Sequence, residues 1–303
     1  MKVLSLKTEN YRNLAAGEYR PGGGVNIVCG ENGLGKTNLI ESIWLFTGCR
    51  SFRSIRDKDV VRFGCDEARL QMEFFSGSRN KEAEIRIDDK RHITLNGVAL
   101  PSGRKMMGEF TAVVFTPLHL AIVKEGPEER RKFLDIALSQ LKPNYAKTIL
   151  EYNKALAQRN ATLRAARDNP AMSAMLDIWD FELAKKGAVI IESRMNYLEQ
   201  IRDKACAAYD EISSGKERLE LKYKEYARES ATGKKEIAES ILKALQEKRE
   251  SDTDRCITSV GAHREDFSID LSGKSARLFG SQGQQRSAAL SLKLAEADII
   301  TQV

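Results

Sequence analysis

The sequence predicts an α/β protein of two lobes, in which both ends of the chain form a mixed lobe and the middle forms an inserted helical lobe. Residues 1–125 contain apolar and polar residues in alternation, which is typical of β-strands. Residues 126–253 are rich in helix-forming residues, and β character returns in residues 254–303. A chain of 303 residues is long enough for two hydrophobic cores. We therefore expect residues 1–125 and 254–303 to form one lobe and residues 126–253 the other.

The first segment is expected to contain several short strands. Alternation at residues 1–8, 69–75 and 83–87 predicts half-buried strands. An Asn-Gly pair at positions 96 and 97, between apolar runs, predicts a β-hairpin. The apolar runs at residues 25–29 and 112–115 predict two further strands, both buried.

The helical segment begins at Gly126-Pro127, where the character of the sequence changes. Apolar spacing predicts a first helix directly after this pair. Later in the chain it predicts strands at 218–222 and 267–271 and a last helix from 284 to about 300. Further helices are expected at 143–167, 172–212 and 234–250. The apolar heptads are not sustained, so the sequence does not predict a long coiled-coil arm.

The most specific local pattern is Gly30-Glu31-Asn32-Gly33-Leu34-Gly35-Lys36-Thr37, which fits the P-loop pattern G-x-x-x-x-G-K-S/T. In a P-loop, backbone N–H groups surround the phosphates of a nucleotide, the lysine reaches the β- and γ-phosphates, and the hydroxyl binds Mg²⁺. A predicted strand before the loop and a helix after it would place the phosphates at a helix N-terminus. The pattern therefore predicts ATP and Mg²⁺ as ligands, and the alternative is a glycine-rich turn with a solvated lysine.

A second polar motif, Ser281-Gln282-Gly283-Gln284-Gln285, precedes the last predicted helix. Polar residues on both sides of a glycine, directly before an apolar helix, favour contact with a ligand. A serine hydroxyl and N–H groups at a helix start would donate to a terminal phosphate. The alternative is a simple polar helix cap.

Charge and composition narrow the class of protein. A net charge of +6 is suited to an anionic partner, of which nucleic acid is the usual one, although many basic proteins bind none. No apolar run approaches about 20 residues, so neither a transmembrane helix nor a membrane partner is expected. The N-terminus lacks the features of a signal peptide, and we expect a cytoplasmic protein. The five cysteines form no C-x-x-C pair, which argues against a zinc site.

Two basic clusters are candidates for contact with phosphates. Each has an equally ordinary alternative, a solvated charged surface. The first cluster is Arg50, Arg53, Arg56, Lys58 and Arg62, and the second is Arg130, Arg131 and Lys132. No zinc finger, aromatic RNA platform or recognition helix is evident, so any DNA binding is expected to follow phosphates and shape.

Six blocks of sequence, in order, resemble the RecF family of SMC-like ATPases. These blocks are residues 11–14, 30–39, 123–135, 152–160, 261–267 and 281–287. The resemblance implies a P-loop ABC/SMC-type ATPase lobe with an inserted helical lobe, an ATP-dependent homodimer, and weak ATPase activity. It further implies binding to double-stranded or gapped DNA, and work with RecR and RecO to direct RecA onto gapped DNA.

The resemblance also implies which residues form the ATP site. One subunit would bind ATP through Gly30, Glu31, Asn32, Gly33, Leu34, Gly35, Lys36, Thr37 and Asn38, with Thr37 also binding Mg²⁺. The other subunit would approach the γ-phosphate in trans through Ser281, Gln282, Gly283 and Gln284. No catalytic residue is assigned.

Two departures from the family pattern affect what we expect. Residues 115–120 read Phe-Thr-Pro-Leu-His-Leu, where the family usually has acidic residues after the proline. The sequence also stops before the apolar strand with paired acidic residues that would hold Mg²⁺ and position water. We therefore expect a truncated chain that hydrolyses ATP inefficiently.

Two other functions compete with this interpretation. A P-loop kinase or phosphotransferase would need an acceptor pocket and an arginine-rich lid, and it would have no use for the motif at 281–283. A structural SMC-type DNA tether is disfavoured because a long heptad arm is not encoded.

Overall fold

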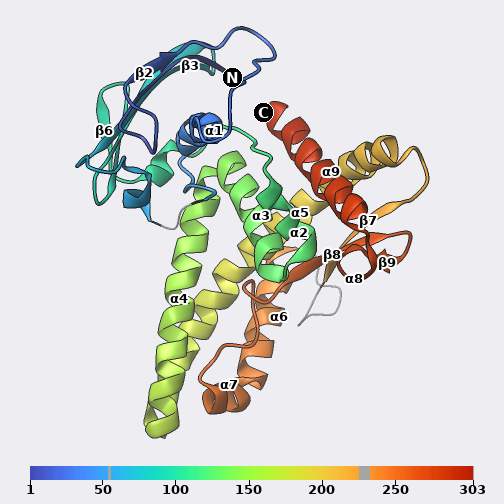
Figure 1. Cartoon of the computed structure of the whole chain (residues 1–303). Coiled ribbons are helices and arrows are strands. Elements are labelled where there is room, and N and C mark those ends of the chain that lie inside the picture. The colour runs from blue at the N-terminus through green and yellow to red at the C-terminus, as the bar shows by residue number, and fades with distance from the viewer. Residues whose placement is uncertain (54–55, 225–232, 303) are drawn as a thin grey trace. The chain divides into compact units, whose positions relative to one another are not determined.

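The computed structural model describes residues 1–53, 56–224 and 233–302, which form two compact units (Figure 1). The units are Met1–Val114 and Phe115–Val303. Residues 254–302 pack with the helices of the second unit. Compact units and functional lobes need not coincide, so the division into an ATPase lobe and a helical lobe stays a prediction.

The first unit is built on an antiparallel six-stranded sheet in the order β2-β1-β3-β4-β5-β6. One face of the sheet is buried, because alternate residues such as Leu70, Met72 and Phe74 of β3 are fully buried. This face packs with residues at the end of helix α1, which lies beside the sheet in Figure 1. The strands are β1 (Lys2–Glu9), β2 (Gly17–Tyr19), β3 (Ala68–Ser76), β4 (Arg79–Ile87), β5 (Arg91–Leu95) and β6 (Val98–Leu100), and the helix is α1 (Lys36–Leu45) with the short turns η1 (Asp57–Val60) and η2 (Gly103–Met106).

Most of the strands predicted for this unit are confirmed, including the hairpin. Asn96 and Gly97 have φ values of 49° and 77° and connect β5 to β6. Two positive φ values are what the tight hairpin turn favoured by Asn-Gly requires.

Two predicted strands are wrong. Residues 25–29 and 112–115 belong to no strand, and in the first run Val25 is 92% exposed and Ile27 is 82% exposed. A strand needs a hydrogen-bonded neighbour, and an apolar run does not say whether one lies beside it. Within this run, the Asn26 side chain accepts from the Gly22 N–H and donates to the carbonyl oxygens of Gly22 and Gly24.

The second unit is mainly helical, with a small sheet in the order β7-β8-β9. The predicted helices are confirmed, and the predicted strands at 218–222 and 267–271 correspond to β7 and β8. No helix in the described ranges is both long enough and apolar enough to cross a bilayer. The elements are η3 (Pro117–Leu120), α2 (Ala121–Lys124), α3 (Pro127–Leu141), α4 (Pro143–Asp168), η4 (Pro170–Met175), α5 (Leu176–Ser213), β7 (Leu219–Lys224), α6 (Lys234–Glu247), α7 (Arg249–Arg255), β8 (Asp266–Leu271), β9 (Lys274–Ser275), α8 (Ala276–Phe279) and α9 (Gln282–Thr301).

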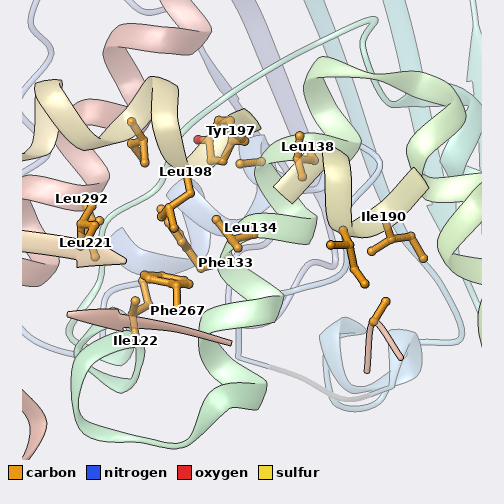
Figure 2. Close-up of a cluster of buried hydrophobic side chains, with 14 of the residues drawn as sticks. Ile122, Phe133, Leu134, Leu138, Ile190, Tyr197, Leu198, Leu221, Phe267 and Leu292 are labelled. Atoms are coloured by element: carbon orange, nitrogen blue, oxygen red, sulfur yellow. The ribbon is translucent and has the colours of Figure 1, made fainter. Parts of the chain in front are cut away.

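The core of the second unit surrounds α5. Figure 2 shows Tyr197 and Leu198 of α5 near Phe133 of α3, with Phe267 of β8 and Leu292 of α9 in the same cluster. All of these side chains are at most 5% exposed. Helix α9 is therefore held in the core along its length, which fixes where its N-terminus projects from this unit.

A buried ionic network joins the elements around α4. Arg159 of α4 is fully buried and donates to Asp180 of α5 at 2.6 Å and to Asp252 of α7 at 2.7 Å. It also donates to the Thr258 hydroxyl at 3.0 Å. Loss of this guanidinium would leave the buried Asp252 without its ion pair and Asp180 with Arg249 as its remaining cation.

Replacing Arg159 by leucine should therefore lower the free energy of unfolding by about 3–5 kcal/mol. Denaturation by urea, followed by circular dichroism, would measure the change. Arg167→Leu is the matched control, because Arg167 lies on the same helix with a side chain that is 55% exposed. Equal stability of the Arg159→Leu variant and the wild type would show that the network contributes nothing to folding.

Candidate functional site

The P-loop has the backbone conformation that its glycines predict. Gly30, Gly33 and Gly35 have φ values of 147°, 87° and 95°, which residues with a Cβ rarely adopt. A Cβ on Gly35 would also lie 2.7 Å from the Asn13 side chain and 2.7 Å from that of Leu14. Gly35 is the N-cap of α1, and no side chain caps this helix. The N–H groups of its first turn are therefore available to an anion.

The lysine and hydroxyl of the motif lie where a phosphate ligand requires them. The Lys36 ammonium donates to the carbonyl oxygens of Gly30 and Glu31, both at 2.6 Å, so the cation lies across the loop. Thr37 is exposed in the first turn of α1. The loop thus combines a cation, helical N–H groups that no side chain caps, and an exposed hydroxyl. These groups fit a nucleotide phosphate with Mg²⁺.

Asn13 braces the P-loop, a role that the sequence analysis missed. Its amide nitrogen donates to the Gly33 carbonyl at 2.6 Å, and its oxygen accepts from the Asn38 amide at 2.6 Å. Asn38, predicted to bind nucleotide, thus also ties the loop to residues 11–14. Residues 11–14 are one of the blocks that resemble the RecF family, but their sequence did not indicate which of them contacts the P-loop.

Glu41 lies at the centre of a second network beneath α1. The carboxylate is fully buried and accepts hydrogen bonds from Arg12 at 2.8 and 2.9 Å, from Arg53 at 3.1 Å and from the Ser51 hydroxyl. Burial by itself would raise the pKa of Glu41. The hydrogen bonds from Arg12, Ser51 and Arg53 outweigh burial and lower that pKa from 4.5 to about 2. This role of Glu41 was not predicted from the sequence. The signal that could have revealed it is an acidic residue among the apolar positions of α1.

This network should make stability depend on pH. A lowered folded-state pKa stabilises the fold at pH values above the unfolded pKa, and this stability is lost as pH falls through the folded pKa. A shift from 4.5 to about 2 corresponds to about 3 kcal/mol. We expect Glu41→Gln to be less stable than the wild type by about that amount at pH 7, with the difference shrinking between pH 4.5 and 2.

Urea denaturation of both proteins across this pH range would measure the difference. Asp89→Asn is the control, because Asp89 has a 79% exposed side chain and pairs only with the exposed Lys58 among the described residues. A difference for Glu41→Gln that stays constant from pH 7 to 2 would contradict the assignment.

The second motif, residues 281–285, forms a capped turn at the start of α9, which we call the signature turn. The Ser281 hydroxyl oxygen accepts from the Gln284 N–H at 3.2 Å, and the Gln284 side-chain oxygen accepts from the Ser281 N–H at 2.6 Å. The helix cap, which was the alternative to a ligand contact, is therefore present as a reciprocal capping box. Because Ser281 accepts through its oxygen, its hydroxyl hydrogen remains to be donated.

Gly283 within the signature turn is not required by the fold. Its φ is not positive, and a Cβ there would meet nothing closer than the Ser281 hydroxyl at 3.9 Å. Glycine inside a helix costs about 1 kcal/mol relative to alanine. The fold therefore does not explain why residue 283 is a glycine. Close approach of another molecule to the backbone at Gly283 would explain it.

The structure corrects the interpretation of one basic cluster. Arg130 is 7% exposed and donates to both carboxylate oxygens of Asp266 at 2.7 and 2.9 Å, so it neither contacts DNA nor forms a solvated face. Arg131 donates to the backbone of Glu265 at 2.9 Å. Lys132 is exposed beside Glu129.

The other basic cluster remains mostly on the surface of the first unit. Arg50, Arg56 and Arg62 are exposed. Arg53 donates to Glu41 and to the side chain of Asn38, and Lys58 pairs with Asp89 at 2.8 Å. The exposed arginines are therefore the members of this cluster that can contact an external phosphate.

His119 replaces the acidic residues expected after Pro117. Its Nδ1 accepts from the Thr116 N–H at 2.9 Å, as an acidic residue would do in a capping box. Burial, followed by the charge of Lys293, lowers the pKa of His119 from 6.5 to about 4. The ring is neutral at pH 7 and serves as a local acceptor, without the negative charge of the family pattern.

Comparisons with known proteins agree with this architecture. The AAA domain family matches residues 5–260. The DNA replication and repair protein RecF of Clostridium perfringens (strain 13 / Type A) is 36% identical over 305 residues, covering 100% of this chain and 82% of the relative. RecF of Clostridioides difficile (strain 630) is 36% identical over 302 residues, covering 99% and 81%.

Solved structures give the same result. The recombination mediator protein RecF with ATP, described as part of the RecFOR pathway, superposes with a TM-score of 0.93 at 35% identity, covering 99% of this chain and 81% of that one. An Smc head bound to the C-terminal winged-helix domain of ScpA has a TM-score of 0.55 at 14% identity, covering 99% and 77%, which shows a shared fold alone. The predicted P-loop ABC/SMC-type ATPase fold is thus confirmed. The chain belongs to the RecF family of DNA replication and repair proteins.

Proposed function

We propose that this chain is an ATP-dependent, dimerising DNA-binding protein of recombinational repair and replication. The observation that carries the proposal is that two motifs suited to binding phosphate belong to separate compact units. The P-loop belongs to the first unit and has uncapped helical N–H groups. The signature turn belongs to the second and contains a glycine that the fold does not need. A solved relative is described as RecF with ATP, which supports ATP as the ligand.

In this proposal, ATP joins two copies of the chain. The P-loop residues 30–37 and Asn38 of one copy hold the triphosphate, with Lys36 on the β- and γ-phosphates and Thr37 on Mg²⁺. Ser281, Gln282, Gly283 and Gln284 of the other copy donate to the γ-phosphate through the serine hydroxyl and the N–H groups of the turn. ADP lacks that phosphate, so it binds without joining the copies.

The DNA-binding part of the proposal rests on charge. The net charge is +6, and Arg50, Arg56 and Arg62 are exposed in the unit that carries the P-loop. Contacts from such arginines to DNA phosphates would position the protein without reading the base sequence. The RecFOR description of a solved member of the family supports RecR and RecO as partners. Gapped duplex DNA as the substrate and RecA loading as the outcome are proposed from the resemblance to the family.

DNA affinity should therefore depend steeply on salt. The logarithm of the association constant should fall linearly with the logarithm of salt concentration, with a slope of about −0.9 for each phosphate neutralised. Fluorescence anisotropy with a labelled duplex in ATP would measure it, and a scrambled duplex of equal length is the control. A slope near zero, or a strong preference for one sequence, would contradict phosphate-directed binding.

The repair role is tested by RecA loading. We expect this chain with ATP, RecR and RecO to accelerate RecA filament formation on gapped DNA coated with single-strand binding protein, compared with RecR and RecO alone. The Lys36→Ala variant should give no acceleration. Equal rates with and without the wild-type chain would remove RecA loading from the proposal.

A further inference from the structure

The side chain of Gln284 is held from two sides within the second unit. Its oxygen accepts from the Ser281 N–H at 2.6 Å, which closes the capping box. Its nitrogen donates to a carboxylate oxygen of Glu217, in the turn between α5 and β7. Glu217 lies 67 residues away in the chain, so a residue outside the motif contacts the signature turn.

Glu217 is in turn anchored to the core. Its second carboxylate oxygen accepts from the Tyr209 hydroxyl at 2.8 Å. Tyr209 is 1% exposed and lies on α5, the helix around which this unit packs. A continuous chain of hydrogen bonds therefore runs from the core through Glu217 and Gln284 to Ser281.

The carboxylate decides which way the Gln284 amide faces. A carboxylate only accepts hydrogen bonds, so the amide nitrogen must face Glu217 and the amide oxygen must face the Ser281 N–H. In the opposite orientation, two oxygens would meet at Glu217 and two donors would meet at Ser281. Without Glu217 only the Ser281 N–H would select the orientation of the amide, so the capping box would be formed for less of the time.

We propose that Glu217 is a positioning residue for the signature turn, which acts through Gln284 to hold Ser281 in its capped conformation. This inference rests on the proposed function, in which Ser281 meets the γ-phosphate on another copy of the chain. A turn that is fixed beforehand loses less conformational freedom when the phosphate arrives. Glu217 itself does not touch the nucleotide.

The first test measures the turn alone, without nucleotide. In Glu217→Leu, hydrogen–deuterium exchange of the Ser281 amide should be about tenfold faster, because its acceptor loses the partner that orients it. Glu217→Gln should restore slow exchange, since its oxygen can accept from Gln284 while its nitrogen donates to the Tyr209 oxygen. Glu211→Leu, at an exposed position near the end of α5, is the matched control and should leave the exchange unchanged.

The second test measures function in the full chain. Glu217→Leu should bind ATP as the wild type does but should dimerise about tenfold more weakly in ATP, and Glu217→Gln should recover wild-type dimerisation. The recovery separates positioning from a requirement for negative charge. Thermal unfolding of each variant establishes that the fold is intact, and a Glu217→Leu variant that unfolds is judged instead through Tyr209→Phe, which removes the anchor of Glu217.

The outcomes separate this inference from the proposed function. Wild-type exchange in Glu217→Leu overturns the positioning role, whatever the protein does with ATP. Faster exchange with undiminished ATP-dependent dimerisation overturns the link between the turn and function. A wild-type chain that never dimerises in ATP refutes the proposed function, while the exchange rates still decide whether Glu217 positions Ser281.

Discussion

Lys36→Ala is expected to abolish ATP binding. The Lys36 ammonium now donates to the carbonyl oxygens of Gly30 and Glu31, so in the free protein it is already held at the loop. In the proposed site these donors would turn to the β- and γ-phosphates and form charge-assisted hydrogen bonds with them. The loss of two such bonds, each contributing about 1.5–3 kcal/mol, corresponds to at least a hundredfold weaker affinity.

Isothermal titration with ATP and Mg²⁺ would measure this loss. Lys58→Ala is the matched control, because Lys58 belongs to the same unit, has a 72% exposed side chain and pairs with Asp89. The control should bind ATP with wild-type affinity. Wild-type affinity in Lys36→Ala would mean that the loop at 30–37 does not hold the nucleotide.

Ser281→Arg is expected to prevent ATP-dependent pairing while ATP binding by the single chain stays intact. Ser281 belongs to the second compact unit and the P-loop to the first, so the change leaves the P-loop residues untouched. The arginine would remove the proposed donor to the γ-phosphate and place a long side chain at the turn. It also removes the N-cap of α9, at a cost of about 1 kcal/mol.

A second variant separates capping from contact with the phosphate. Ser281→Asp retains an N-cap acceptor, so α9 keeps its stability, but its negative charge repels the γ-phosphate. Both variants should bind ATP with wild-type affinity and remain monomers by light scattering. Normal dimerisation of Ser281→Asp in ATP would show that the turn caps a helix and does nothing more.

Local patterns predicted the elements whose structure is decided locally. The hairpin at Asn96-Gly97 follows from the backbone preferences of those two residues. Helix α9 begins at Gln282, two residues before its predicted start, because Ser281 and Gln284 form a capping box. That spacing, a serine followed three residues later by glutamine, was readable in the sequence.

The two strands that were wrongly predicted show that a local apolar pattern does not specify strand pairing. Residues 25–29 and 112–115 have the apolar character of buried strands, yet neither has a hydrogen-bonded neighbour strand in the described ranges. Strand formation depends on pairing between distant segments, which apolar content alone does not specify.

The candidate site likewise has features that the local sequence predicts and features that depend on distant residues. The glycines of the P-loop were predictable because each adopts a positive φ value that residues with a Cβ rarely adopt. The contacts that hold the site join distant positions, such as Asn13 with Gly33, 20 residues apart. Glu41 and Glu217 likewise acquire their roles only when the fold brings arginine or glutamine to them.

The central claim is that one chain presents half of a nucleotide site and that ATP completes it between two copies. Sedimentation velocity of the wild-type chain with ATP, with ADP and without nucleotide tests this directly. We predict a dimer in ATP and a monomer in the other two conditions. A sedimentation coefficient that is the same in all three conditions would contradict the claim.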